Sequence, residues 1–195
     1  MNTTSRFRIG VFGASGVGKT TFIHQYIFGR VLDAHRYAVH YSKLVELETE
    51  SIMVEIIETK SDPSWIPDCD AVIFVFSSMS VPTFSFIQEY ANRRRGLVAL
   101  VATMSDGNPH STSYEDGFNQ ALQIGAGYFY FSAFRPYSAR EPFNFLLGRF
   151  VVNHPAPTLV QELPLNFLNR VRIKARQVLR RRFGKYLPIA GYFDS

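Results

Sequence analysis

A glycine-rich segment near the start of the chain holds the residues whose types and spacing are best suited to chemistry. It matches the pattern GxxxxGK[ST] with Gly13, Ala14, Ser15, Gly16, Val17, Gly18, Lys19 and Thr20, and Thr21 follows. Glycines allow backbone N–H groups to turn inward and surround phosphate oxygens. We expect Lys19 to reach the outer phosphates of a nucleotide and the Thr20 hydroxyl to ligate Mg²⁺. The alternative is that the glycines serve only the packing of a strand-to-helix turn.

This chemistry needs a strand before the loop and a helix after it, and the flanking sequence predicts both. Arg8–Phe12 is a short apolar run, and Lys19–Phe28 has apolar residues at helical spacing, with Gly29 placed to cap its end. The positive end of that helix would face a bound anion. Further on, Tyr41–Thr49 and Ser51–Glu58 are strand-like runs with a short connection, and together they predict a hairpin.

The remaining chain, to about residue 153, alternates apolar runs with segments of helical spacing. Continuous apolar runs predict strands that are buried on both faces of a sheet. The predicted strands are Ala71–Phe76, Leu97–Ala102 and Tyr128–Phe131, and the predicted helices are Val81–Arg95, Tyr114–Ile124 and Arg140–Val152. This order predicts an α/β fold of three layers, built on a mostly parallel six-stranded sheet with one antiparallel hairpin.

The loop motif and the β–loop–α–β–β beginning resemble the small GTPases of the Ras superfamily. The resemblance covers about residues 6–153. It implies the Ras-like form of the P-loop NTPase fold, GTP or GDP as the bound nucleotide, and Mg²⁺ as the metal. A domain of residues 1–155 would then carry the nucleotide site, and residues 156–195 would form a basic extension.

The resemblance also places the residues that such a protein uses for hydrolysis, and several differ here. The family's DxxG motif falls on Glu58-Thr59-Lys60-Ser61, so that Glu58 keeps a carboxylate near the metal while Ser61 replaces the glycine. Asp62 occupies the place of the water-positioning Gln, and Arg36 that of a Mg²⁺-binding Thr. We therefore expect slow or defective GTP hydrolysis.

Two further motifs of the family concern the base. NKxD corresponds to Thr103-Met104-Ser105-Asp106, and Asp106 could still accept hydrogen bonds from guanine, unless it is an ordinary loop carboxylate. SAK corresponds to Ser132-Ala133-Phe134, where the resemblance implies that the Ala133 N–H meets the guanine carbonyl. Phe134 would either stack on the base or pack against the domain. Guanine is therefore the expected base, with fewer contacts than in the family.

Within the superfamily, Glu58-Thr59-Lys60 followed by Trp65 is similar to the RGK branch. A basic extension that offers no lipid-modified cysteine is a second similarity. That branch keeps NKxD, which is altered here, so the likeness to it is partial.

The extension is strongly basic. Residues 1–162 hold 13 Lys/Arg and 15 Asp/Glu, whereas residues 163–195 hold 8 and 1. Apolar residues recur at helical spacing from Leu168 to Phe183, and basic residues fill the other faces, among them Arg172, Lys174, Arg176, Arg180, Arg181 and Arg182. Such a helix suits an anionic membrane surface or the groove of an acidic, calmodulin-like protein. Alternatively, it packs on the domain. No RNA-binding motif accompanies it, so we expect no nucleic-acid partner.

Composition and the lack of targeting signals in the sequence limit the cellular compartment in which we expect the protein. The single cysteine, Cys69, excludes an internal disulfide framework, and no run of 18 apolar residues occurs. We expect a cytoplasmic protein that contacts the inner face of the plasma membrane through its extension. Two functions remain open: a nucleotide-dependent signalling switch that an effector protein reads, and a pseudo-GTPase scaffold that binds partners without nucleotide cycling. A P-loop kinase of small molecules would need an arginine-rich lid, which the sequence does not offer.

Overall fold

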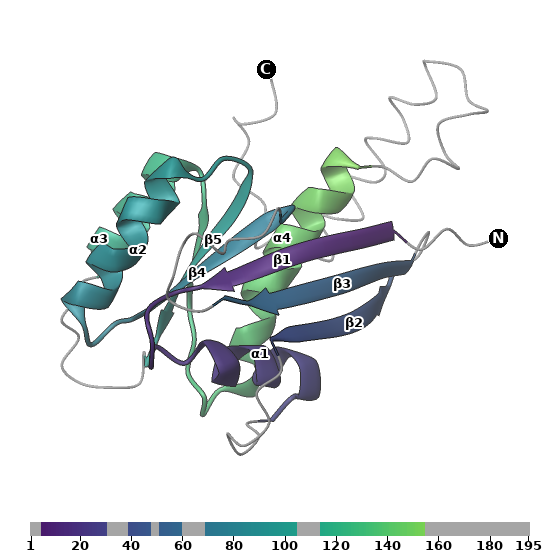
Figure 1. The fold of residues 1–195 in the computed structure, drawn as a ribbon, viewed down its shortest axis with the longest axis horizontal. Helices are drawn as coiled ribbons and strands as arrows, with labels where there is room; N and C mark the ends of the chain where they lie inside the picture. Colours follow the sequence, from purple (N-terminus) through teal and green to yellow (C-terminus); the bar gives the residue numbers. More distant parts are fainter. Residues whose placement is uncertain (1–4, 31–38, 48–50, 60–68, 105–113, 155–195) are drawn as a thin grey trace.

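The computed structural model describes residues 5–30, 39–47, 51–59, 69–104 and 114–154 (Figure 1). The strands among these residues are β1 (Ser5–Phe12), β2 (His40–Glu46), β3 (Ser51–Glu58), β4 (Ala71–Ser77), β5 (Leu97–Thr103) and β6 (Gly127–Tyr130). The α-helices are α1 (Lys19–Phe28), α2 (Val81–Arg93), α3 (Tyr114–Ile124) and α4 (Arg140–Asn153), and a short 3-10 helix spans Pro136–Ala139.

The strands form one sheet in the order β2-β3-β1-β4-β5-β6. Only the pair β2 and β3 is antiparallel, and every other neighbouring pair is parallel. All seven residues of β4 are buried, as expected for a parallel strand with helices on both sides. In β2, at one edge, exposed and half-buried residues alternate, because a single helical layer covers it. The predicted α/β fold with a mostly parallel six-stranded sheet and one hairpin is confirmed.

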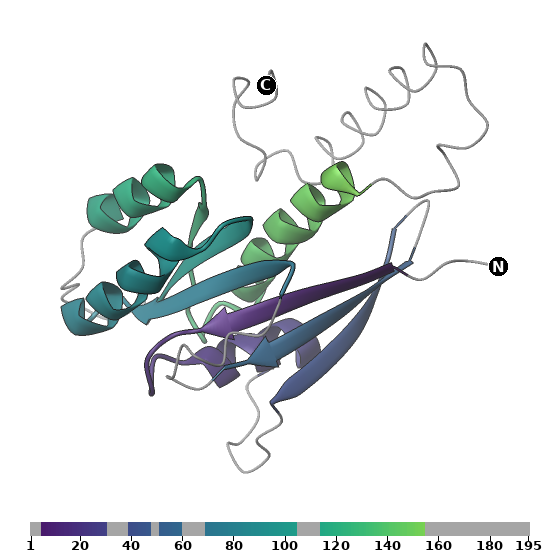
Figure 2. The ribbon, with the colours of Figure 1, turned by 45° about the horizontal axis from the view of Figure 1, so that its top comes forward.

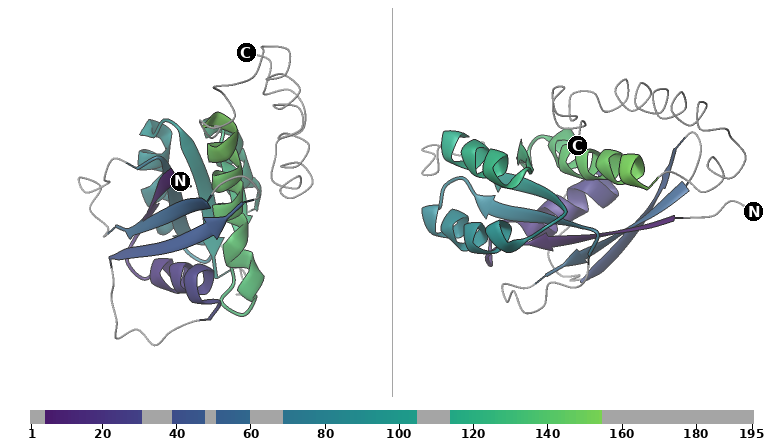
Figure 3. Two further views of the ribbon diagram at one scale, coloured as in Figure 1. Left: turned by 90° about the vertical axis from the view of Figure 1, so that its right-hand side faces the viewer. Right: turned by 90° about the horizontal axis from the view of Figure 1, so that it is seen from above.

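Helices cover both faces of this sheet, which gives three layers (Figure 3). α1 and α4 pack on one face, and α2 and α3 lie side by side on the other (Figure 2). Each layer buries an apolar stripe that would otherwise face water. No helix among the described residues has both the length and the apolar character to cross a membrane.

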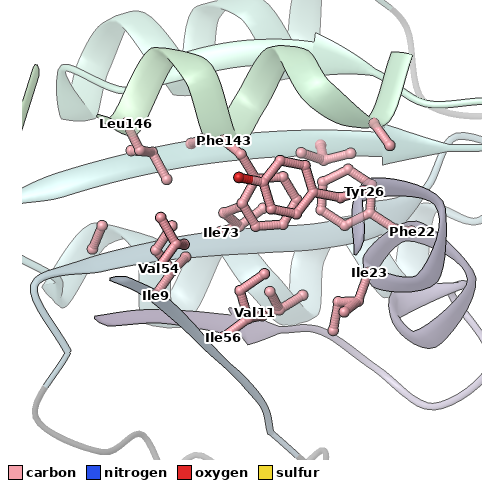
Figure 4. Packing of buried hydrophobic residues seen from close by; sticks show 14 of the residues in the cluster. Ile9, Val11, Phe22, Ile23, Tyr26, Val54, Ile56, Ile73, Phe143 and Leu146 are labelled. Atoms are coloured by element: carbon pink, nitrogen blue, oxygen red, sulfur yellow. The ribbon is translucent and has the colours of Figure 1, made fainter. Parts of the chain in front are cut away.

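The core between the sheet and the pair α1 and α4 centres on aromatic rings (Figure 4). Phe143 of α4 stacks on Tyr26 with ring centroids 3.8 Å apart and on Phe22 at 5.2 Å. Beneath these rings lie the inward side chains of the central strands, including Val11 and Ile73. The stacked rings join α1, which follows the glycine-rich loop, to the last helix of the domain. This core therefore fixes the position of α1.

The other core lies between the sheet and the pair α2 and α3. Phe12, the last residue of β1, contacts Phe74 edge-on at 5.7 Å between ring centroids and stacks on Phe86 of α2 at 5.5 Å. Phe12 is fully buried. The strand is thus held on both faces up to the residue before the loop, so the loop starts from a fixed point.

Predicted element boundaries agree with the structure to within a few residues, and the differences have local causes. β1 begins at Ser5 rather than at Arg8, because its pairing with β3 continues along the polar residues. α2 ends at Arg93 rather than Arg95, since Arg94 is extended and its guanidinium donates to the Cys69 carbonyl oxygen. β6 ends at Tyr130, but the Phe131 N–H still bonds to the Ala102 carbonyl. The basic extension lies outside the described residues.

The stacked rings predict a large effect of truncating Phe143, whose side chain is 1% exposed. Phe143→Ala should lower the free energy of unfolding by about 3–5 kcal/mol, measured by urea denaturation. Phe134→Ala is the matched control, because that side chain is 84% exposed, and its effect should stay within about 0.5 kcal/mol. Equal effects of the two substitutions would contradict the packing described here.

Candidate functional site

The glycine-rich loop connects the carboxyl end of β1 to the amino end of α1 and lies against β4. Gly13 is the point of closest approach, because a Cβ built there would overlap the Val75 carbonyl oxygen and lie 3.1 Å from the Val75 carbonyl carbon. β1 is also the strand at which the sheet order reverses, since β3 pairs on one side of it and β4 on the other. Ligands of open α/β sheets bind beside the carboxyl ends of the strands at such a point.

Two other glycines give the loop its turn. Gly16 has φ of 77° and Gly18 has φ of 91°, values that residues with a Cβ rarely adopt. Gly18 is also the N-cap of α1, and no side chain caps this helix. The first N–H groups of a helix lack partners within the helix, so they can bind an anion. The loop and helix together suit a phosphate group.

Lys19 is folded over this loop and nearly buried. Its Nζ donates to the carbonyl oxygens of Gly13 and Ala14, both at 2.9 Å. Burial lowers the pKa of Lys19 from its ordinary value, and the nearby Glu58 carboxylate partly opposes that shift. An ammonium group has three N–H donors. Two of them hold Lys19 in place over the loop, which leaves a third that can meet a negatively charged ligand.

Thr20 and Glu58 are brought together from different elements. The Thr20 hydroxyl donates to the Glu58 carboxylate oxygen at 2.7 Å, where α1 begins and β3 ends. Mg²⁺ takes oxygen ligands at about 2.0–2.1 Å in an octahedron, whose adjacent oxygens are then about 2.9 Å apart. The two side chains therefore fit two neighbouring positions around Mg²⁺. Within the described part of the chain, no three His, Cys, Asp or Glu side chains group as a metal site, so phosphate and water would have to supply the other ligands.

The loop is tied to the sheet by Thr103, a residue whose part in the site the sequence did not reveal. Its hydroxyl oxygen lies 2.7 Å from the Val17 carbonyl oxygen and 2.9 Å from that of Phe76. A hydroxyl donates a single proton, so it bonds to one or shares between both. Val17 itself is 1% exposed, and its side chain belongs to the core. Among the predicted nucleotide-binding residues, Val17 can thus contribute only its backbone.

Met104 follows Thr103 and has an unusual backbone. Its φ of 56° is the one positive value at a residue other than glycine in the described segments. Ser78 holds it through a bond from its hydroxyl to the Met104 carbonyl oxygen at 3.1 Å, and the Ser77 hydroxyl lies 3.3 Å from the Met104 sulfur. The Met104 side chain is exposed. This positions an apolar side chain at the same edge of the sheet as the loop.

Ser132 and Ala133 form a turn after β6 at that edge. The Ser132 side chain is buried, and its hydroxyl accepts a hydrogen bond from the Phe134 N–H at 3.2 Å. The bond from the Phe131 N–H to the Ala102 carbonyl links this turn to the end of β5. Phe134 does not pack on the described part of the domain, since its side chain is 84% exposed. The packing alternative for Phe134 is therefore wrong for those elements.

The structure brings together part of the predicted site. The loop residues, Thr20, Glu58 and the turn at Ser132 lie at the carboxyl edge of the sheet; Ser15 and Gly16 are exposed there, and Thr21 is half-buried. The other predicted residues are outside the described ranges, namely Asp106, Arg36, Ser61, Asp62 and the basic residues of the extension.

The hydrogen bonding of the Thr103 hydroxyl to Val17 and Phe76 leads to a prediction. Thr103→Val, which keeps the shape of the side chain but removes the hydroxyl, should leave a buried carbonyl oxygen without its donor. The free energy of unfolding should fall by about 1–3 kcal/mol. Thr103→Ser keeps the hydroxyl and should retain most of the lost stability. Urea denaturation of the two variants and the parent chain measures this; a Ser variant that is as unstable as the Val variant would show that the methyl group, not the hydroxyl, matters.

Comparison of the chain with models of known protein families gave no match, and comparison with curated proteins gave none either. The function must therefore be argued from the residues and contacts described above.

Proposed function

We propose that this protein binds a guanine nucleotide at Gly13–Thr20 in the manner of a small GTPase. The observation that carries the proposal is the position of Lys19, whose ammonium group is held over a loop of left-handed glycines at the amino end of α1. A buried cation, uncapped helix N–H groups and a loop with no room for a Cβ at Gly13 fit a phosphate chain. A turn that served only packing would not require a lysine there.

The arrangement of the sheet supports the Ras-like form of the P-loop fold. The resemblance implies a parallel sheet that carries one antiparallel hairpin, made of the two strands that follow the first helix. β2 and β3 form that hairpin. The first helix and the last pack on the same face, and the loop lies at the strand where the order reverses. These features support a nucleotide site at the carboxyl edge of the sheet.

The base would lie between the ends of β5 and β6. Asp106 would accept hydrogen bonds from guanine, and the backbone N–H of Ala133 would meet its carbonyl oxygen. Met104 and Phe134 stand where the family has lysines, and both are exposed apolar side chains at this edge. They would contribute stacking, which tolerates any base. We therefore propose a preference for guanine over adenine that is weaker than in the family.

Hydrolysis would be slow, as in a signalling protein that is occupied by nucleotide for long periods. Glu58, which accepts the hydrogen bond of the Thr20 hydroxyl, would contribute a carboxylate beside the metal. Asp62 and Ser61 replace the residues that orient the attacking water and meet the outer phosphate. Effector binding would then depend on which nucleotide is bound rather than on fast turnover.

A pseudo-GTPase scaffold is the second candidate, and one observation favours it. The key polar groups of the loop have partners within the chain: Lys19 bonds to two loop carbonyls, and Thr20 bonds to Glu58. When the buried polar groups of a loop have hydrogen-bond partners within the chain, the loop needs no ligand to keep its conformation. The site could therefore persist without nucleotide and support a surface that a partner protein binds.

One experiment separates the two candidates. Denaturing the purified protein and analysing the released small molecules by chromatography would identify any nucleotide it carries. Titration of the stripped protein with GTP, GDP and ATP, with and without Mg²⁺, would then give the affinities. We expect guanine nucleotide to bind more tightly than ATP. A protein that binds no nucleotide at about millimolar concentration, which corresponds to a binding free energy weaker than about −4 kcal/mol, would favour the scaffold.

Lys19→Ala should weaken nucleotide binding by about 30-fold or more, because losing a buried contact between opposite charges costs about 2–5 kcal/mol. Arg30→Gln is the control: it removes one positive charge just after α1, where the side chain is exposed. Isothermal titration with GTP measures both affinities. If Lys19→Ala binds as tightly as Arg30→Gln, the loop does not hold the phosphates.

The contact between Thr20 and Glu58 predicts how Mg²⁺ acts on binding. Thr20→Ala should remove most of the gain in GTP affinity that Mg²⁺ provides, because it deletes a metal ligand. Thr20→Ser retains the hydroxyl and should keep that gain. Affinity measured with Mg²⁺ and with a chelator gives the ratio for each variant, and equal ratios for Ala and Ser would contradict a metal role for the Thr20 oxygen.

A further inference from the structure

β2 is the last strand at one end of the sheet, and its outer edge pairs with none of the described strands (Figure 1). In an antiparallel pair, only alternate residues exchange backbone hydrogen bonds with the neighbouring strand. The Glu58 N–H donates to the Val39 carbonyl oxygen at 2.9 Å, and the register assigns the same bonding to every second residue after Val39. The residues between these direct their N–H and C=O groups away from β3, and they are His40, Ser42, Leu44 and Glu46.

The side chains of these four residues share one face of the hairpin and are exposed. The alternate side chains point to α1, where the Tyr41 hydroxyl lies 3.1 Å from His24 and Lys43 donates to the Tyr26 carbonyl oxygen at 2.9 Å. Within the described chain, no residue of β2 or β3 belongs to the core beneath α2 and α3. The described helices therefore leave the outer face of β2 open, and Leu44 at its centre is 48% exposed.

The outer edge of β2 lacks most features that prevent edge strands from pairing. Such features are proline, a bulge, a short length, or lysines that project from the edge. β2 has seven residues without proline, and its register with β3 is unbroken. Its one lysine, Lys43, is bonded to its own domain. β6, at the other end of the sheet, has four residues that are all half-buried, and it contacts both α3 and α4. β2 is thus the described edge that best suits a further strand.

We propose that β2 pairs with β2 of a second copy of this chain, antiparallel and centred on Lys43. The two sheets would then join into one, related by a twofold axis. In this register His40 lies opposite Glu46 of the second copy, and Ser42 lies opposite Leu44. These are the residues whose backbone groups point outward, so that they would exchange about eight hydrogen bonds across the axis.

The two ends of β2 carry complementary chemistry, which favours a second copy over an unrelated strand. His40 at one end offers an imidazole N–H donor, and Glu46 at the other offers a carboxylate. Antiparallel self-pairing brings these ends together twice. At the centre, the small Ser42 leaves room for the two Leu44 side chains, which would be diagonal neighbours about 7–8 Å apart. Each Leu44 also lies beside the half-buried Met53 of β3, so an apolar stripe would cross the axis.

Lys43 is the residue that would lie opposite its own copy, and like charges directly opposite each other weaken a strand pair. Its ammonium group, however, is turned toward its own α1. It donates to the Tyr26 carbonyl oxygen and lies 4.4 Å from the centroid of the Tyr26 ring. Burial lowers the pKa of Lys43, and the charge of Arg140 lowers it further. The repulsion at the axis is therefore reduced.

The pairing is independent of the proposed nucleotide, because none of the residues in it belongs to the loop, the metal ligands or the base site. The test uses the full chain in sedimentation velocity at about 1–100 μM, a range that covers micromolar dissociation constants. We expect the parent chain to form a species of twice its mass. A parent chain that stays monomeric over the whole range would overturn the proposal.

Ser42→Pro removes one outward N–H from each copy without removing a bond to β3, and a sheet edge accepts proline at such a position. It should raise the dissociation constant of the dimer by about 10-fold or more. Ser42→Ala keeps the N–H and should leave that constant within about 3-fold of the parent value. Dimers of equal stability in the two variants would count against pairing through the backbone of β2.

A second pair of variants decides the question if Ser42→Pro does not fold. Leu44→Lys places a charge beside the axis on each copy, where the like charges repel and should raise the dissociation constant by about 10-fold or more. Leu122→Lys makes the same change on α3, where Leu122 is 59% exposed, and should leave the dimer unchanged. Equal effects of the two lysines would show that the outer face of β2 is not the interface.

The register is tested by His40→Cys combined with Glu46→Cys. These positions are about 20 Å apart within one strand, so a disulfide between them can form only between two copies. After oxidation we expect the double variant to run as a cross-linked dimer on a non-reducing gel. His40→Cys alone should not cross-link, and the native Cys69 is buried. Equal cross-linking of the single and double variants, or none in the double variant, would overturn the proposed register.

Discussion

The close approach of Gly13 to the Val75 carbonyl oxygen is the constraint on which the rest of the site depends. It exists because β1 and β4 are parallel neighbours, and because Phe12 is held by rings on β4 and α2 up to the residue before the loop. The chain must therefore turn in the space beside β4, and only glycine fits at that position. α1 starts where the turn ends, with its amino end beside Lys19.

Around that turn, buried polar groups are satisfied from several elements. Lys19 bonds to the carbonyls of the loop itself, Thr20 to Glu58 at the end of β3, and Val17 is reached by Thr103 at the end of β5. The contacts of Thr20 and Thr103 each join residues far apart in the chain and fix the loop against the sheet. A loop fixed in this way would be pre-organised for the proposed phosphate ligand, because binding would require little further ordering. The same contacts explain how it could persist without one.

The domain has two edges with different chemistry. The carboxyl edge carries the glycine-rich loop, Met104 and the turn at Ser132, where a nucleotide is proposed to bind. The amino edge carries the arginines of β1 and α2, and the end of α4 packs beside it through Phe150 and Phe7. The parallel strands cause this separation, since the residues that follow β1, β4, β5 and β6 lie at one edge and the residues that precede β4, β5 and β6 lie at the other. Events at one edge can thus proceed without blocking the other.

The sequence by itself determined the order of strands and helices, because buried parallel strands are continuous apolar runs and helices show their own spacing. It also singled out Gly13–Thr20 as a candidate phosphate-binding loop, since the glycines, lysine and threonine of such a loop act through local geometry. It did not reveal the bond of Thr103 to Val17, the exposure of Phe134 or the bond of the Arg8 N–H to Asp70. These depend on which strands become neighbours, and only the packed sheet decides that, because the pairing free energy arises between segments far apart in the chain.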